Sequence, residues 1–76
     1  MTKEEFIDLF KEEVEIEEEL NEESDLTALE EWDSMAAMVV VSIADEHFGV
    51  KLSAEEIGKL TKVKDLIEAI GKDKFN

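Results

Sequence analysis

The residues best placed to do chemistry stand at the start of an apolar segment. Asp33 and Ser34 come directly before the run from Met35 to Ala44, in which Ser42 is the only polar residue. If a helix begins here, the serine hydroxyl lies beside unpaired backbone N–H groups, at the positive end of the helix dipole. A phosphate ester on Ser34 would be stabilised there, as anions are at helix N-termini. On their own, the two residues are more often an ordinary helix cap.

No second set of residues predicts a catalytic or metal centre. The chain has no cysteine, which excludes disulfides and cysteine-based zinc sites. His47 is the single histidine and has no companion ligand or nucleophile, so we interpret it as a surface residue. No Gly-rich phosphate loop and no Asp-x-Asp-x-Asp-Gly calcium loop is present. We therefore expect neither enzymatic activity nor a metal site.

The charge is concentrated in one part of the chain. Asp and Glu number 22 against 8 basic residues, which gives a net charge of −14. Between Lys11 and Lys51 there is no Lys or Arg, so this stretch carries the whole excess of acid. Nucleic-acid binding is excluded because phosphate contacts need cations, and anionic membrane surfaces are unfavourable for the same reason. Basic protein partners are favoured, since complementary charge speeds encounter.

Length and hydropathy predict a small protein in the aqueous phase. The 76 residues predict a single domain over 1–76. The N-terminal residues lack the basic and apolar regions of a signal peptide, and no apolar run approaches the roughly 20 residues of a membrane span. With no cysteine in addition, we expect a cytoplasmic protein. No heptad pattern extends over three repeats, which favours a monomer.

Caps and apolar spacing predict the first half of the fold. Thr2 and Glu5 form a capping box for a helix that runs to about residue 15, with Phe6, Phe10 and Val14 on one face. Residues 15–32 show only spaced apolar positions in an acidic background. We expect a long loop anchored by those side chains, with a short turn near 26–30.

Three further helices are predicted, which makes the chain an all-α four-helix bundle with a long first loop and a short third helix. The second helix begins at Asp33 or Ser34 and ends at Gly49. The third covers residues 54–60 after a capping box that begins at Ser53. The fourth is capped by Thr61 and ended by Gly71, and residues 71–76 are expected to be a frayed tail.

Several segments together resemble one known family. Asp33-Ser34-Met35, followed by an apolar helix that ends in His47-Phe48-Gly49-Val50, resembles the Asp-Ser-Leu/Met motif and helix end of acyl carrier proteins. Residues 52–57 and 61–67 are similar to the family's short third helix and to the start of its last helix. The resemblance extends over nearly the whole chain and includes its length and acidity.

The resemblance implies a carrier that catalyses nothing itself. Ser34 is the expected attachment point of 4′-phosphopantetheine, which a separate phosphopantetheinyl transferase takes from coenzyme A. Asp33 is expected to cap the helix and help to present Ser34, and Met35 to lie beside the arm and contact partner enzymes. Acyl groups would travel as thioesters to the enzymes of a fatty-acid-like or specialised pathway. The apolar side chains expected to line an acyl pocket between the second and third helices are Met38, Val41, Ile57 and Leu60, although such stripes are more often plain core.

Some alternatives stay open at this point. On the exposed face expected just after Ser34, Ala36 and Val39 occupy positions where the fatty-acid carriers usually place an Asp and a Glu, which favours a specialised carrier. D-alanyl carriers also use Asp-Ser-Met, so an aminoacyl cargo is possible, whereas the glycines typical of peptidyl carriers are missing before Ser34. An unmodified acidic module for basic partners or calcium is the alternative from another class.

Overall fold

The first helix, α1 (Lys3–Val14), begins at the predicted capping box. In the computed structural model, which describes residues 1–76, Thr2 Oγ1 accepts a hydrogen bond from the Glu5 N–H at 3.0 Å, and Glu5 Oε1 accepts one from the Thr2 N–H at 2.8 Å. The bond from the Thr2 backbone lowers the pKa of Glu5. The helix ends at Glu15, whose φ of 61° lies in the left-handed region.

The first loop is anchored to the core near its beginning and near its end by buried apolar side chains. Its buried side chains are Ile16, Leu26 and Leu29, and the expected turn is the 3₁₀ segment η1 (Leu26–Ala28). Asp25 Oδ1 accepts hydrogen bonds from the Thr27 hydroxyl at 2.6 Å and the Thr27 N–H at 2.9 Å. These two bonds lower the pKa of Asp25. The predicted anchoring of a long loop by spaced apolar residues is therefore confirmed.

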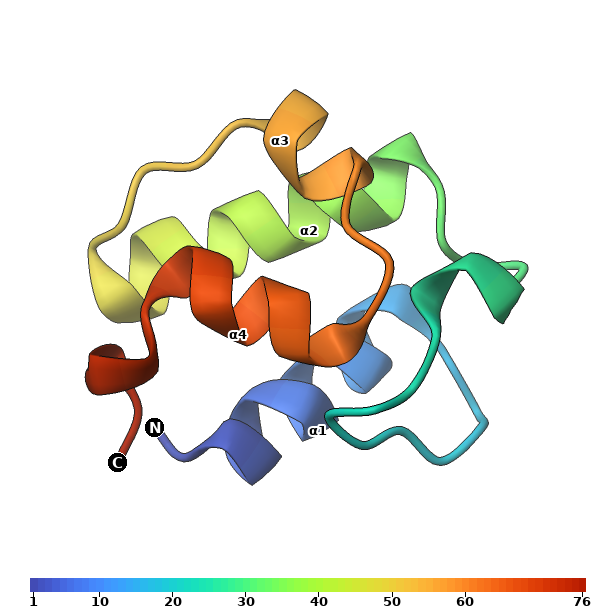
Figure 1. Ribbon diagram of the computed structural model, residues 1–76, viewed down its shortest axis with the longest axis horizontal. Helices are drawn as coiled ribbons and strands as arrows, with labels where there is room; N and C mark the ends of the chain where they lie inside the picture. Colours follow the sequence, from blue (N-terminus) through green and yellow to red (C-terminus); the bar gives the residue numbers. More distant parts are fainter.

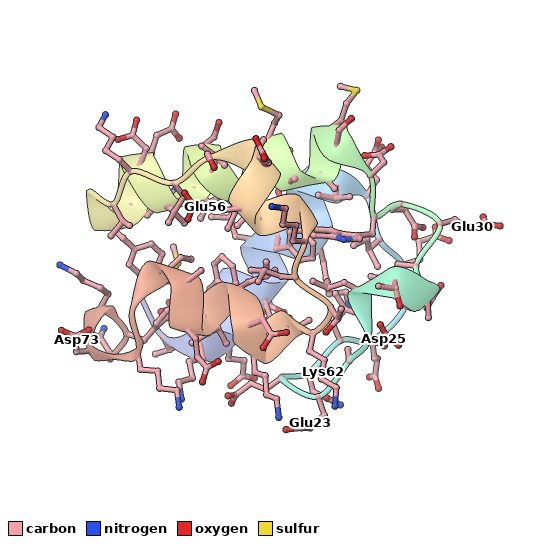
Figure 2. All side chains as sticks on the ribbon, turned by 45° about the horizontal axis from the view of Figure 1, so that its top comes forward. Glu23, Asp25, Glu30, Glu56, Lys62 and Asp73 are labelled. Carbon is pink, nitrogen blue, oxygen red and sulfur yellow. The ribbon has the colours of Figure 1, made fainter.

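The same loop is joined to the start of the last helix. The Leu26 N–H donates to the Thr61 carbonyl at 2.7 Å, and the Val63 N–H donates to the Ser24 carbonyl at 3.1 Å. The Glu23 carboxylate lies 3.7 Å from Lys62 Nζ, and Figure 2 shows Glu23, Asp25 and Lys62 gathered at this edge of the molecule. Backbone bonds and an ion pair thus hold together segments some 40 positions apart in the sequence.

The second helix runs from α2 (Ser34–Ile43) into the π-helical turn η2 (Ala44–Phe48). It ends at Gly49 as predicted, with φ 67°, but the widened last turn was not predicted. The helix buries one face, made by Ala36, Ala37, Val40, Ile43 and Ala44. The opposite face leaves Met35 75% and Met38 56% exposed.

The last two helices are shorter than the sequence suggests. α3 (Ala54–Gly58) is capped by Ser53, whose hydroxyl accepts from the Glu56 N–H at 3.2 Å, but it ends two residues before the predicted Leu60. α4 (Val63–Ile70) begins after Lys62, so the prediction that Thr61 caps it is wrong. The first N–H groups of the helix, those of Val63 and Lys64, donate to the loop carbonyls of Ser24 and Glu22 at 3.1 and 2.9 Å, so no threonine hydroxyl caps them. Asp65 Oδ2 accepts from the Lys62 N–H at 3.1 Å.

The helices pack around one apolar core, and α2 contacts both α3 and α1. Figure 1 shows α4 running across the view between α2 and α1. The only strand-like feature is an isolated bridge between Asp25 and Lys62. The predicted all-α bundle with a long first loop and a short third helix is confirmed. None of the helices combines the length and the apolar character needed to cross a membrane.

The C-terminal residues differ from the expected frayed tail. A short 3₁₀ turn, η3 (Lys72–Lys74), brings the chain back to the bundle, and the Phe75 ring lies 4.7 Å from Phe48 and 5.7 Å from Phe6 between centroids. The Asn76 N–H donates to the Met1 carbonyl at 3.1 Å, which places the two ends side by side (Figure 1). The sequence pattern of α4 stops at Gly71 and gives no sign of this aromatic contact.

Replacing the tail aromatic tests this packing. Phe75→Ala removes two aromatic contacts from a half-buried ring, so we expect the free energy of unfolding to fall by about 2 kcal/mol in urea denaturation. The exposed neighbour serves as the control, because Lys74→Ala should change stability by less than about 0.5 kcal/mol. Equal stability of the two variants would show that the tail does not pack in solution.

The left-handed residue at the end of α1 gives a second prediction. Glu15→Gly relieves the Cβ strain of a positive φ, so we expect a gain of about 1 kcal/mol in the free energy of unfolding. Glu12→Gly removes the same charge inside the helix and should cost about 1 kcal/mol. Urea denaturation measures the free energy of unfolding of both variants. A loss of stability in Glu15→Gly would contradict the left-handed backbone conformation of Glu15.

Candidate functional site

At the start of α2, Asp33 caps the helix and Ser34 is its first residue. Asp33 is the N-cap, with extended backbone, and its Oδ1 accepts from the Ala36 N–H at 2.9 Å. Ser34 is the first residue of the helix and is exposed. Because the aspartate makes the capping bond, the serine hydroxyl is not needed for it. The structure therefore assigns the capping bond to Asp33 and leaves the Ser34 hydroxyl free of it.

The backbone around Ser34 offers free donors. Of the first N–H groups of α2, that of Ala36 is taken by the Asp33 side chain and that of Ala37 by the Asp33 carbonyl, at 3.0 Å. The N–H groups of Ser34 and Met35 have no intrahelical partner, as is usual in a first turn. A negatively charged group attached to Ser34 Oγ would meet these donors and the positive end of the helix dipole.

A hollow of about 390 Å³ opens beside Ser34. On one side it is bounded by Trp32, Asp33 and Ser34, and on the other by the short third helix and its end, through Ala54, Glu55, Gly58 and Lys59. The Trp32 ring is fixed edge-on against Phe10, with 6.0 Å between centroids. The serine that the sequence singled out thus lies at the rim of a cavity between α2 and α3.

Sequence reasoning did not single out the residues across this hollow. The one available signal was Gly58, because a glycine inside a capped helix destabilises it by about 1 kcal/mol relative to alanine. Nothing lies within 4 Å of a Cβ built on Gly58, so close packing does not require the glycine. The contact of Trp32 with Phe10, and the hollow that Lys59 and Ser34 both line, depend on tertiary structure, which local patterns do not encode.

The four residues expected to line an acyl pocket do not surround a common cavity. Ile57 is fully buried in the core, and Val41 and Leu60 are half-buried against it. Met38 lies on the other face of α2, since the buried positions of the helix fall at 36, 37, 40 and 43. None of the surface hollows is lined by Val41, Ile57 or Leu60. An acyl pocket at these residues therefore stays a prediction that requires α2 and α3 to move apart.

Two exposed methionines instead line a groove on the outer face of α2. The groove, of about 570 Å³, contains Met35, Met38 and Val39, with Glu13 and Glu46 among its polar neighbours. His47 lies at the same groove and is exposed, as predicted. Its complete lining is Glu13, Met35, Met38, Val39, Ser42, Ile43, Glu46 and His47.

The position of Ala36 corrects an expectation. It was expected on the exposed face beside Ser34, but it is only 2% exposed. It lies in a smaller hollow where the end of α1 meets the start of α2, together with Glu13 and Glu31. The Glu31 Oε1 atom is buried here and has no hydrogen-bond partner. Of the two positions where acidic residues were expected, only Val39 remains partly exposed.

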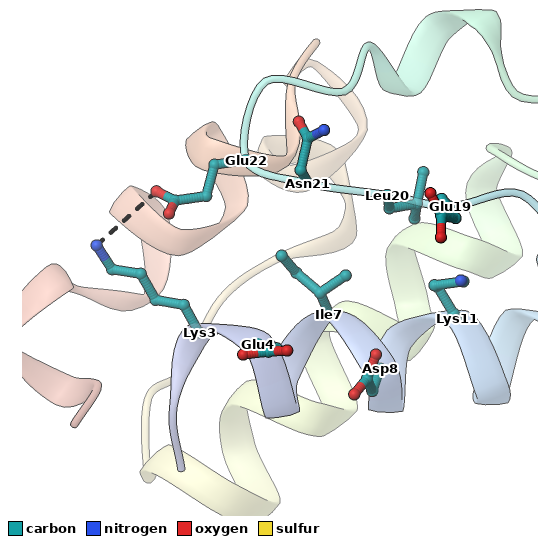
Figure 3. Close-up of a pocket in the computed structure, with 9 residues that line it drawn as sticks. All are labelled: Lys3, Glu4, Ile7, Asp8, Lys11, Glu19, Leu20, Asn21 and Glu22. Carbon is teal, nitrogen blue, oxygen red and sulfur yellow. Dashed lines mark ion pairs between the residues drawn. The ribbon is translucent and has the colours of Figure 1, made fainter.

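The acidic first loop borders another hollow, drawn in Figure 3. It has a volume of about 450 Å³ and lies between α1 and residues 19–22. Its rim carries both signs of charge, and Lys3 Nζ lies 3.8 Å from the Glu22 carboxylate. The chain contains no group of three or more His, Asp or Glu side chains that could hold a metal ion. The carboxylates of the calcium alternative therefore do not converge on one point.

Comparison with protein families gives a match over most of the chain. Residues 4–70 match the family model described as a phosphopantetheine attachment site. The chain belongs to the phosphopantetheine-binding carrier family. Comparisons with curated proteins and with solved structures gave no match. Carrier domains of this family are the place where 4′-phosphopantetheine is covalently attached, and they are generally not catalytic.

Membership of the carrier family agrees with the site. A covalent phosphate ester needs an accessible hydroxyl and benefits from free N–H donors, and Ser34 provides the first next to the second. A carrier domain also implies interaction with a phosphopantetheinyl transferase and with enzymes that handle acyl groups. The family match begins in the first turn of α1, covers the start of α2 and extends to the last residue of α4.

The cap that presents Ser34 can be tested by substitution. Asp33→Ala removes the acceptor for the Ala36 N–H, so we expect a loss of about 1 kcal/mol in the free energy of unfolding, measured in urea. Asp33→Asn keeps a side-chain oxygen at the cap and should lose only a few tenths of a kcal/mol. Equal losses in the two variants would contradict the capping role.

Proposed function

We propose that this chain is an acyl carrier protein that carries acyl groups as thioesters on a 4′-phosphopantetheine arm attached to Ser34. The observation that supports this residue most strongly is the separation of roles at the start of α2. Asp33 makes the capping bond to Ala36, and Ser34 is left exposed beside the free N–H groups. Among the serines of the chain, Ser34 alone combines this position with the Asp-Ser-Met motif.

The loading step requires only a hydroxyl from the carrier. In the proposed reaction, Ser34 Oγ attacks the phosphorus of coenzyme A that bears the pantetheine. An oxygen–phosphorus bond forms, the diphosphate bond breaks, and adenosine 3′,5′-bisphosphate leaves. The hydroxyl proton passes to a base on the transferase. The product is a phosphodiester, and its single negative charge lies at the N-terminus of α2.

The composition of the chain suits this function. No cysteine is present, so the thiol of the arm would be the only thiol on the protein. Acyl groups would therefore be carried at one position. Tethering also converts each transfer to a docked enzyme into an effectively intramolecular reaction, at high effective concentration. In this account the carrier itself is not an enzyme, acts as a monomer and works in the cytoplasm.

The surface beside Ser34 bears on the choice of partners. Met35 and Met38 are exposed along the groove on the outer face of α2, and the acidic residues Glu13 and Glu46 line the same groove. We propose partner enzymes that combine apolar contact with a basic rim, as in a specialised pathway rather than general fatty-acid elongation. Because Asp33-Ser34-Met35 also resembles D-alanyl carriers, an aminoacyl thioester is the alternative cargo, and the mass of the loaded thioester distinguishes the two.

Intact-protein mass spectrometry tests the attachment. The protein is incubated with coenzyme A and a broad-specificity phosphopantetheinyl transferase, alongside Ser34→Ala and Ser42→Ala. Ser42 is a matched control because it is an exposed serine on the same helix. We expect one phosphopantetheine on the wild type and on Ser42→Ala, and none on Ser34→Ala. Addition to Ser34→Ala, or no addition to the wild type with two unrelated transferases, contradicts the proposal.

A further inference from the structure

We infer that Trp32 is a positioning residue for the loading of Ser34. By packing on Phe10 of α1, its ring fixes the segment that presents the serine hydroxyl to the phosphopantetheinyl transferase. This inference rests on the proposed attachment at Ser34 and adds which side chain sets the rate of that reaction from the carrier's side. Trp32 acts through the backbone that joins it to Ser34, two residues further along the chain, and not on the reacting atoms.

The segment that leads into α2 has few interactions of its own. Leu29 and Ala36 are buried, but none of the residues between them is. Of residues 30–33, only Trp32 donates a backbone hydrogen bond, to the Leu29 carbonyl at 3.2 Å. Trp32 is also the only side chain between Leu29 and Ala36 that packs against the apolar core, since Met35 is exposed. The position of this segment on the protein therefore depends largely on one ring.

Phe10 gives the tryptophan ring a fixed support. The two rings lie 6.0 Å apart between centroids with their planes at 72°, which is the edge-to-face arrangement that aromatic pairs favour. Phe10 is fully buried, and its own ring lies 6.4 Å from Phe6, one turn earlier in α1. The contact therefore joins the segment before Ser34 to the part of α1 that is packed most firmly in the core.

The proposed reaction at Ser34 is sensitive to the position of the serine oxygen. The transferase has to bring the phosphorus of coenzyme A into line with this oxygen, and a misplacement of about 1 Å can lower such a rate by about two orders of magnitude. The Asp33 cap holds the first turn of α2 together through the Ala36 N–H, but it makes no bond to another element. Trp32 supplies the missing constraint, because it holds that turn relative to α1.

Initial rates of loading test the inference, with coenzyme A at saturation and the carrier concentration varied. We expect Trp32→Leu to lower kcat about tenfold and to change the KM for the carrier by less than about twofold, because the misplaced hydroxyl weakens the transition state rather than docking. Trp32→Phe keeps an aromatic ring and should remain within about twofold of the wild type in both constants. A purely structural role gives another pattern. An unfolded fraction only lowers the concentration of usable carrier, so it raises the apparent KM and leaves kcat unchanged.

Phe75→Ala is the matched control for a general loss of stability. Phe75 is another half-buried aromatic ring that packs on Phe6, at 5.7 Å between centroids, but it follows α4 and does not touch the segment before Ser34. We expect its kcat to equal that of the wild type, with circular dichroism showing that each variant is folded at the assay temperature. An equal fall of kcat in Phe75→Ala and Trp32→Leu, or an equal fall in Trp32→Phe, overturns the inference.

The buried partner distinguishes positioning from direct contact with the transferase. Phe10 is 0% exposed, so the transferase cannot touch it. If Trp32 acts through Phe10, Phe10→Leu should also lower kcat, and the double variant should lose no more than the roughly tenfold of Trp32→Leu alone, whereas independent effects multiply. Wild-type kcat in Phe10→Leu, or multiplied losses in the double variant, would contradict this mechanism.

The outcomes also separate this inference from the function on which it rests. A loaded wild type together with wild-type constants in Trp32→Leu, or with a change in KM alone, overturns the positioning role and leaves the attachment at Ser34 intact. A wild type that gains no phosphopantetheine contradicts the proposed function itself.

Discussion

The structure depends on the burial of one face of α2, a helix that is apolar almost all round. The chain is too small to cover the other face of this helix as well. Ala36, Ala37 and Ala44 let the other elements approach α2 closely, and Val40 and Ile43 fill the space between. The other helices and the first loop cover this face and leave Met35 and Met38 exposed. The start of the helix is consequently both fixed from within, by packing, and open to solvent. An attachment site for a mobile arm needs both properties.

The fold brings lysines from outside residues 12–50 to a few of the acidic side chains in that stretch. Residues 12–50 hold no cation, and the lysines that pair with them come from both flanks of this stretch, Lys3 on one side and Lys51, Lys62 and Lys64 on the other. Lys62 and Lys64 lie 3.7 and 3.5 Å from the Glu23 carboxylate in the first loop. Lys59 reaches the hollow beside Ser34 in the same way. The lysines at the start of α4 therefore help to hold the loop, while Lys59 faces the start of α2.

Local signals predicted the helices well because each begins at a cap or ends at a glycine that the sequence displays. Thr2, Ser53 and Gly49 act as predicted, whereas Thr61 does not cap α4, because loop carbonyls accept from the first N–H groups of that helix. Features that depend on distant contacts were not predictable in this way. They include the packing of Phe75 on Phe48, the burial of Ala36 and the hollow that joins Trp32 to α3. At the site, the sequence predicted the Asp33 cap that the structure shows, but not the residues across the hollow from it.

Locating the modification on the chain tests the central claim most directly. The loaded protein is digested, and its peptides are fragmented in a mass spectrometer that detects release of the pantetheine group. The account predicts phosphopantetheine on one peptide only, at Ser34. Modification at Ser24, Ser42 or Ser53, or a loaded peptide without Ser34, would contradict it.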